Sequence, residues 1–115
     1  MKKIIFISCT FLLLASCITQ KPLYSWDKYE LTSYNYLKNG DEVSTQQLIE
    51  NYQKIIENQK GGTRGVVPPG IYADYGFILL QIGKTEEGKA MLLKEIALYP
   101  ESKIFINRIL KMIEE

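Results

Sequence analysis

Few residues of this chain have the type and spacing that chemistry requires. Its 115 residues include no histidine and two cysteines, Cys9 and Cys17. Histidine and cysteine are common zinc ligands, and histidine is the most frequent general base. We therefore expect no metal centre, no cofactor and no enzymatic activity, and we assign no catalytic residue.

Glycine-rich and acidic segments do not alter that expectation. Segment 60–70 (KGGTRGVVPPG) contains four glycines but lacks the Lys-Ser/Thr that follows them in a phosphate-binding loop. The acidic pairs 86–87 and 114–115 are adjacent residues, which we interpret as solvated helix ends. With 14 basic and 13 acidic side chains the formal charge is +1, which argues against nucleic-acid binding.

The first 16 residues have the pattern of an export signal. Lys2 and Lys3 precede an apolar run from Ile4 to Ala15. This basic start and short apolar region are typical of a secretory signal peptide, and the run is shorter than the roughly 20 residues that a membrane-spanning helix needs. We expect residues 1–16 to be removed, with Cys9 a small apolar residue of the discarded peptide.

The segment Leu14-Ala15-Ser16-Cys17 resembles a bacterial lipobox. The resemblance implies cleavage before Cys17, a diacylglyceryl thioether on its sulfur and, in a Gram-negative cell, an N-acyl chain such as palmitate; several acyl chains give stable anchoring. Ile18 and Thr19 replace the aspartate that retains such proteins at the inner membrane, so the expected location is the periplasmic face of the outer membrane. An ordinary cleaved signal or a short membrane anchor are the alternatives.

Removal of the signal leaves 99 residues (115 minus 16) with Cys17 as the single cysteine, so no internal disulfide can form. The loss of Lys2 and Lys3 changes the formal charge to −1. Residues 17–25 have no apolar period and read as a lipidated tether. We expect one domain, 26–115, held together by its apolar core alone.

Apolar residues of this domain recur with helical spacing. The pattern predicts five helices and no strand. The first runs from Asp27 to Lys38, with Tyr29, Tyr36 and Leu37 on one face, and ends at Asn39-Gly40. The second begins at Ser44 as an N-cap, paired with Gln47 in a capping box. The remaining three span about Ile71 to Ile82, Thr85 to Tyr99 and Ser102 to Glu114, with Thr85 as a cap.

Between the second and third helices, segment 60–70 is predicted to be a loop. Arg64 lies among glycines and precedes Val66, Val67 and Pro68. An exposed cation beside an apolar strip makes this insert the preferred partner-binding surface. The alternative is a flexible spacer.

The pair of helices between Pro69 and Pro100 resembles a tetratricopeptide (TPR) repeat, a helical hairpin of about 34 residues. The residues that match are Tyr72, Tyr75, Gly76, Leu79, Gly83, Gly88, Leu92 and Pro100. Glu95 stands where the repeat usually has alanine, and it lies either on a solvated face or in a groove where it contacts a partner. When the spacing of this repeat is applied to the residues before and after it, the chain contains about two and a half TPR-like repeats.

The chain also resembles a family of small bacterial lipoproteins of uncharacterised function, often encoded beside a lipoprotein like the curli secretion channel. The segments that carry this resemblance are 26–29 (WDKY), 67–73 (VPPGIYA) and 95–102 (EIALYPES). It implies an accessory role in envelope assembly or secretion, with an envelope protein such as that channel-like lipoprotein as partner.

Aromatic residues are concentrated near the expected lipid, at Tyr24, Trp26, Tyr29, Tyr34 and Tyr36. Tyrosine and tryptophan suit interfaces because each has an apolar body and a polar tip. Alternatively, Trp26 and Tyr29 fill the core while Tyr34 is exposed. The sequence thus predicts an outer-membrane-anchored periplasmic scaffold for protein–protein interaction; the alternative is a lipoprotein that binds peptidoglycan or another glycan through these aromatic residues.

Overall fold

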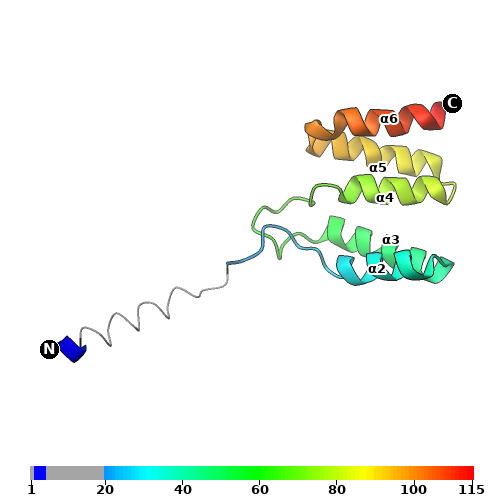
Figure 1. Ribbon diagram of the computed structural model, residues 1–115. Helices are drawn as coiled ribbons and strands as arrows, with labels where there is room; N and C mark the ends of the chain where they lie inside the picture. Colours follow the sequence, from blue (N-terminus) through cyan, green and yellow to red (C-terminus); the bar gives the residue numbers. More distant parts are fainter. Residues whose placement is uncertain (1, 5–19) are drawn as a thin grey trace.

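The computed structural model describes residues 2–4 and 20–115, and residues 20–115 form an all-helical domain (Figure 1). The helices are α2 (Tyr29–Asn39), α3 (Glu42–Glu57), α4 (Ile71–Gln81), α5 (Thr85–Leu98) and α6 (Lys103–Glu114), with a 3-10 turn η1 (Pro100–Ser102) before α6. The all-α prediction is confirmed for residues 20–115, which contain five α-helices and no strand. The predicted lipidation site Cys17 and the predicted signal peptide, apart from residues 2–4, lie outside the described residues.

Local signals end the helices where the sequence predicts. Gly40 follows α2 with a φ of 58°, and its N–H donates to the Tyr36 carbonyl at 2.9 Å. Gly83 follows α4 with a φ of 86°. Both glycines have the left-handed conformation that favours residues without a Cβ.

The predicted caps of α3 and α5 are wrong. Helix α3 begins at Glu42, and its cap is Asp41, whose carboxylate accepts a hydrogen bond from the Ser44 N–H at 2.8 Å. Ser44 is therefore the third residue of the helix. Thr85 is the first residue of α5, which has no side-chain cap. The hydrogen bonds from Ser44 hold the pKa of the Asp41 carboxyl below its ordinary value.

The helices form two antiparallel hairpins, α2–α3 and α4–α5, with α6 packed beside α5 (Figure 1). The centre of the core lies between α3 and α4, where Leu48, Ile55, Ile71 and Leu79 are buried. Leu92 of α5 and Ile106 of α6 are also buried and extend the apolar interior to the end of the stack.

Only part of the predicted face of α2 is buried. Tyr29 and Tyr36 pack against the core and Thr32 is buried between them, but Leu37 is 81% exposed. Positions 29, 32 and 36 follow the i, i+3, i+7 pattern of one helix face, whereas position 37 is rotated about 100° from position 36. The prediction that Leu37 shares this face is wrong.

Helices α4 and α5 approach closely at two glycines. A Cβ built on Gly76 would lie 2.8 Å from the Gly88 carbonyl oxygen, and a Cβ built on Gly88 would lie 2.8 Å from the Gly76 oxygen. Neither position has room for a side chain. Gly76 and Gly88, which both match the repeat pattern in the sequence, contribute equally to this close approach.

Tyrosine hydroxyls connect the first hairpin to the second. Tyr29 Oη donates to Asp74 Oδ2 at 3.1 Å, and Tyr36 Oη donates to Gln81 Oε1 at 3.2 Å. Burial and the neighbouring Asp74 carboxylate raise the pKa of the Tyr29 hydroxyl. Partial burial likewise raises the pKa of Asp74, and the hydrogen bond from Tyr29 opposes that shift. The two hairpins are thus held by polar contacts as well as by the core.

Five aromatic rings form a continuous series from the start of the domain into its interior. They are Tyr24, Trp26, Tyr29, Tyr52 and Tyr75, with consecutive ring centroids 5.6 to 6.2 Å apart. Such spacing is favourable for aromatic pairs. Tyr34 is exposed, as expected, but Trp26 is 41% exposed and does not fill the core.

Candidate partner-binding site

The insert between α3 and α4 is bonded to the segment predicted to be a tether. The Thr63 and Arg64 N–H groups donate to the carbonyls of Pro22 and Leu23, at 3.0 and 3.1 Å. The buried Gln59 side chain accepts from the Ser25 N–H at 3.0 Å and donates to the Ser25 carbonyl at 2.7 Å. Residues 22–25, within the predicted tether, are therefore packed against the insert and the end of α3.

Gly62 permits this pairing. A Cβ at this position would lie 2.7 Å from both the Leu23 carbonyl oxygen and the Tyr24 Cα. At the adjacent Gly61, a Cβ would meet only the Ser25 side chain, at an ordinary 3.4 Å. The insert is therefore fixed to residues 22–25 by close backbone contact, which disagrees with the flexible-spacer interpretation.

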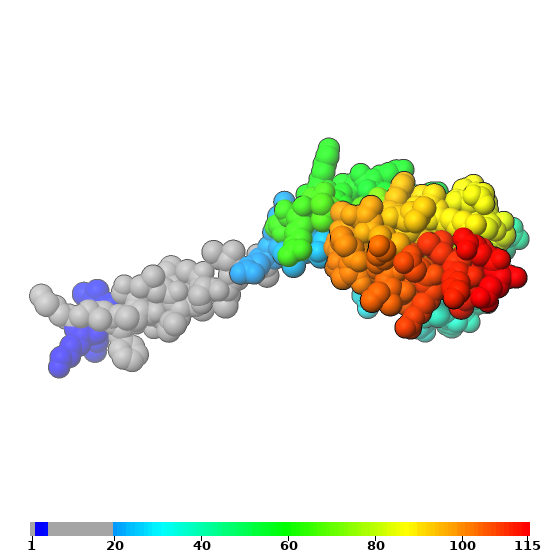
Figure 2. Space-filling view, turned by 90° about the horizontal axis from the view of Figure 1, so that it is seen from above, coloured from blue at the N-terminus to red at the C-terminus, as the bar shows by residue number. Residues whose placement is uncertain are grey.

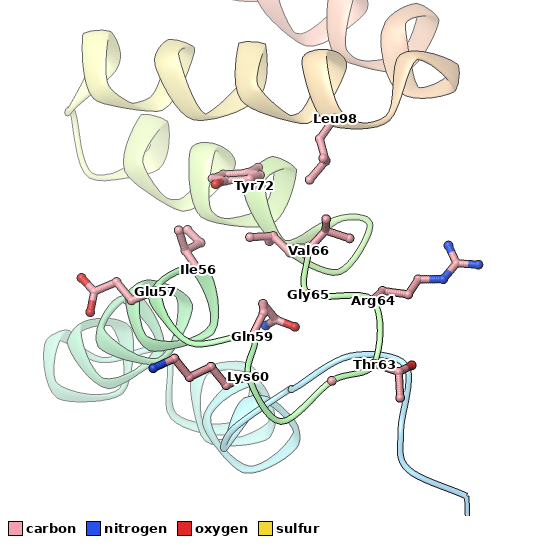
Figure 3. A pocket seen from close by; sticks show the side chains of 12 residues that line it. Ile56, Glu57, Gln59, Lys60, Thr63, Arg64, Gly65, Val66, Tyr72 and Leu98 are labelled. Atoms are coloured by element: carbon pink, nitrogen blue, oxygen red, sulfur yellow. The ribbon is translucent and has the colours of Figure 1, made fainter.

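Arg64 projects from the insert into solvent, as the sequence predicts (Figure 3). Its guanidinium carbon lies 5.8 Å from the centre of the Tyr24 ring, and its Nη1 donates to Tyr24 Oη at 3.3 Å. This cation–π arrangement holds the charge beside the aromatic rings.

The two valines of the predicted apolar strip have different environments. Val66 is 38% exposed, whereas Val67 is 7% exposed and belongs to the core cluster. The Val67 carbonyl accepts a hydrogen bond from Tyr99 Oη at 2.6 Å. Burial and contact with Tyr24 raise the pKa of Tyr99 to about 12. Val67 is therefore largely buried, yet it also lines the hollow beside the insert, and its assignment to the partner-binding site stays a prediction.

The structure also differs from the sequence prediction in the environment of Glu95. Both readings put its side chain at a surface, but it is only 3% exposed. Its Oε1 accepts a hydrogen bond from the Gly70 N–H at 2.8 Å, while Oε2 is buried without a hydrogen-bond partner. Because Gly70 precedes the first residue of α4, the carboxylate lies at that helix's N-terminus, where a negative charge is favourable. Glu95 is a structural residue.

Val66 and Arg64 instead border a hollow of about 540 Å³ between the end of α3, the insert and the second hairpin (Figure 3). Its apolar lining comes from Ile56, Val66, Val67, Tyr72 and Leu98. A second hollow of about 270 Å³ shares Tyr72 and Leu98 and continues along α5. We call the two hollows together the insert groove.

The polar rim of the insert groove is mainly cationic. Lys60 and Arg64 line the larger hollow, and Lys94 lines the smaller one. The Lys94 ammonium lies 5.8 Å from the centre of the Tyr72 ring. Glu57 is an acidic lining residue, and Figure 3 shows it pointing to the opposite side from Arg64. The groove thus combines apolar side chains with an excess of positive charge, which suits an extended segment carrying apolar and acidic residues.

Sequence reasoning missed several residues of this groove. Tyr72 enters the sequence interpretation only as a match to the repeat, and Ile56 and Leu98 have no predicted role in binding. The insert brings them together by folding back between the hairpins, and no spacing within one helix indicates that contact. Within residues 2–4 and 20–115, no cluster of three potential metal ligands occurs, and no helix has the length and apolar character needed to cross a membrane.

Fold and groove together define a small all-α domain of two helical hairpins and a terminal helix. The chain belongs to the DUF4810 family, a domain of unknown function, whose model matches residues 23–109. This match includes Leu23 to Ser25, in agreement with a packed domain that begins before residue 26. No curated protein and no solved structure matches the chain.

Proposed function

We propose that this protein is a non-enzymatic scaffold that binds an envelope protein through the insert groove. The observation that carries the proposal is the groove itself, an open, apolar and cationic surface shared by α3, the insert and α5. Stacked helical hairpins commonly offer such surfaces to extended protein segments. The proposed partner is an envelope assembly or secretion protein, such as a lipoprotein resembling the curli secretion channel.

The proposed setting is the periplasmic face of the outer membrane, with acyl chains on Cys17 as anchor. This rests on the lipobox-like segment 14–17 and on the residues that follow it. Metabolic labelling with palmitate tests it. The wild-type chain should be labelled and recovered in the outer-membrane fraction, whereas Cys17→Ala should be neither. An unlabelled wild-type chain would contradict the anchor.

We also propose that the hairpins are TPR-like. The close crossing at Gly76 and Gly88 supports this, since a TPR has small residues where its two helices meet. An experimental structure of the domain tests it through the packing of successive hairpins. Hairpins that do not repeat by a common rotation would exclude a TPR-like arrangement.

A photo-crosslinking amino acid at position 66 tests the partner site in living cells. We expect an adduct with one envelope protein, identified by mass spectrometry, and loss of that adduct when Arg64 and Lys94 are both changed to Glu. The matched control is the same amino acid at Glu86, exposed at the far end of α5. Equal adducts from both positions, or none from position 66, would contradict binding at the groove.

Glycan binding is a second candidate, favoured by the exposure of Trp26 and Tyr34. Aromatic rings with polar tips suit contact with sugars. Sedimentation with purified peptidoglycan sacculi tests it. The wild-type protein should sediment and Trp26→Ala should remain in solution; a wild-type protein that stays in the supernatant would exclude this role.

A further inference from the structure

The packed start of the domain and the insert lie at one end of the helix stack. Figure 2 shows the insert (green) beside the residues just after position 20 (light blue), with the C-terminus (red) at the opposite end. Hydrogen bonds from Thr63 and Arg64 fix Pro22 and Leu23 to the insert. Any tether from Cys17 must therefore end at Pro22, on this face of the domain.

The short tether limits which part of the domain can reach a membrane. Five residues, 18–22, separate Cys17 from the first fixed carbonyl, and five extended residues span at most about 18 Å. Helix α3, with 16 residues, is about 24 Å long. Because the tether is shorter than the stack, the insert end stays close to the membrane.

The side chains of this end have the chemistry of a membrane interface. Leu23 is 55% exposed and Trp26 41% exposed, although both are large and apolar. Tyr24 packs edge-on against Trp26 with ring centroids 6.2 Å apart. Tryptophan and tyrosine are enriched at the headgroup level of membranes.

Positive charges accompany these aromatic rings. Arg64 is held over the Tyr24 ring, and Lys21 immediately precedes the fixed segment. The nearest acidic residue in sequence, Asp27, is engaged by the buried Asn51, whose Nδ2 donates to Asp27 Oδ2 at 2.7 Å. Cationic side chains close to a bilayer are attracted to phosphate-bearing headgroups.

We propose that the insert end is a membrane-contacting face that rests on a glycerophospholipid surface. Leu23 and Trp26 lie in the headgroup layer, and Lys21 and Arg64 contact lipid phosphates. The helices then stand upright on the membrane, and the insert groove opens just above it. This inference rests on the proposed lipidation of Cys17.

Trp26 is the single tryptophan of the chain and serves as an intrinsic probe. The lipidated protein is purified from membranes and reconstituted into vesicles of phosphatidylethanolamine and phosphatidylglycerol, with or without a lipid carrying a nitroxide on its headgroup. We expect the nitroxide to quench the emission of Trp26 about two-fold, because interfacial tryptophans lie at headgroup depth.

The matched control moves the probe to the other end of the stack. Trp26→Phe combined with Leu37→Trp places the tryptophan at an exposed position near the C-terminal end of α2. Its emission should be unaffected by the nitroxide. Two outcomes in protein that floats with the vesicles would overturn the membrane-contacting face while leaving the anchor intact. They are equal quenching at the two positions and no quenching at position 26. Protein that does not float would overturn both.

Charge variants test the phosphate contacts. Lys21→Glu combined with Arg64→Glu should reduce the quenching of Trp26, whereas Lys38→Glu combined with Lys84→Glu, at the far end, should leave it unchanged. Circular dichroism verifies that both variants keep their helical content. Unchanged quenching in the first variant would overturn the role of these cations.

Discussion

The Glu95 carboxylate accepts a hydrogen bond from the Gly70 N–H at 2.8 Å, and this bond joins α5 to the residue that immediately precedes α4. The first N–H groups of a helix have no partners within the helix, and the helix dipole makes a negative charge favourable there. Gly70 has no side chain with which to cap, so a residue 25 positions later provides the acceptor. The second hairpin is closed by this contact.

Glu95→Ala should lower the free energy of unfolding by about 1–3 kcal/mol, because the Gly70 N–H loses its acceptor in a partly buried site. Glu95→Gln should lose less, since its amide oxygen can still accept. Urea denaturation measures both. The control is Glu86→Ala, an exposed acid of the same helix, which should change stability by less than about 0.5 kcal/mol. A Glu95→Ala cost no larger than that of the control would show that the bond is unimportant.

Gly76→Ala and Gly88→Ala should each destabilise the domain, because the new Cβ would lie 2.8 Å from a backbone oxygen of the facing helix. Overpacking of this kind costs about 1–3 kcal/mol, which exceeds the roughly 0.5–1 kcal/mol that alanine gains over glycine in a helix. Thermal unfolding provides the measurement, with Ala90→Ser on the exposed face of α5 as control. A raised melting temperature in either glycine variant would refute the close crossing.

Gly62→Ala should open the pairing between the insert and residues 22–25, because its Cβ would collide with the Leu23 oxygen and the Tyr24 Cα. Amide hydrogen exchange at Thr63 and Arg64 should become faster, as their N–H groups donate to Pro22 and Leu23. The adjacent Gly61→Ala introduces only an ordinary contact and should leave exchange unchanged. Slow exchange in both variants would mean that the pairing does not depend on Gly62.

Asp41 should make stability depend on pH in the acid range. Its pKa is lowered in the folded state from an ordinary value of 3.8, so its contribution is complete above that value and is lost as pH falls through the folded pKa. Asp41→Asn retains a cap that does not titrate. The difference in unfolding midpoint between wild type and Asp41→Asn should therefore shrink on acidification below about pH 4. A difference that is independent of pH would exclude an ionised cap.

The helices follow from the sequence because their signals are local. Apolar spacing marks α3 and α6, and Gly40, Gly83 and Pro100 end or follow helices through backbone preferences that hold without any tertiary contact. The cap of α3 is also set by local signals, although the sequence prediction chose Ser44 instead of Asp41. Asp41 lies three residues earlier and offers an equally good oxygen, and a single sequence does not rank the two.

Tertiary structure decided which residues of the insert region face solvent. Val66 and Val67 are adjacent and chemically alike and both line the groove, yet Val66 is exposed whereas Val67 is buried in the core cluster. Glu95 is an acidic residue that any local rule would assign to the surface, yet it is buried, and its Oε1 finds a hydrogen-bond donor in Gly70, 25 positions away. The sequence of residues 22–25 is typical of a linker, but in the structure Gly62 and Gln59, which are distant in sequence, contact this segment. These outcomes depend on a loop folding back between two hairpins, whereas local sequence patterns encode only the backbone preferences of neighbouring residues.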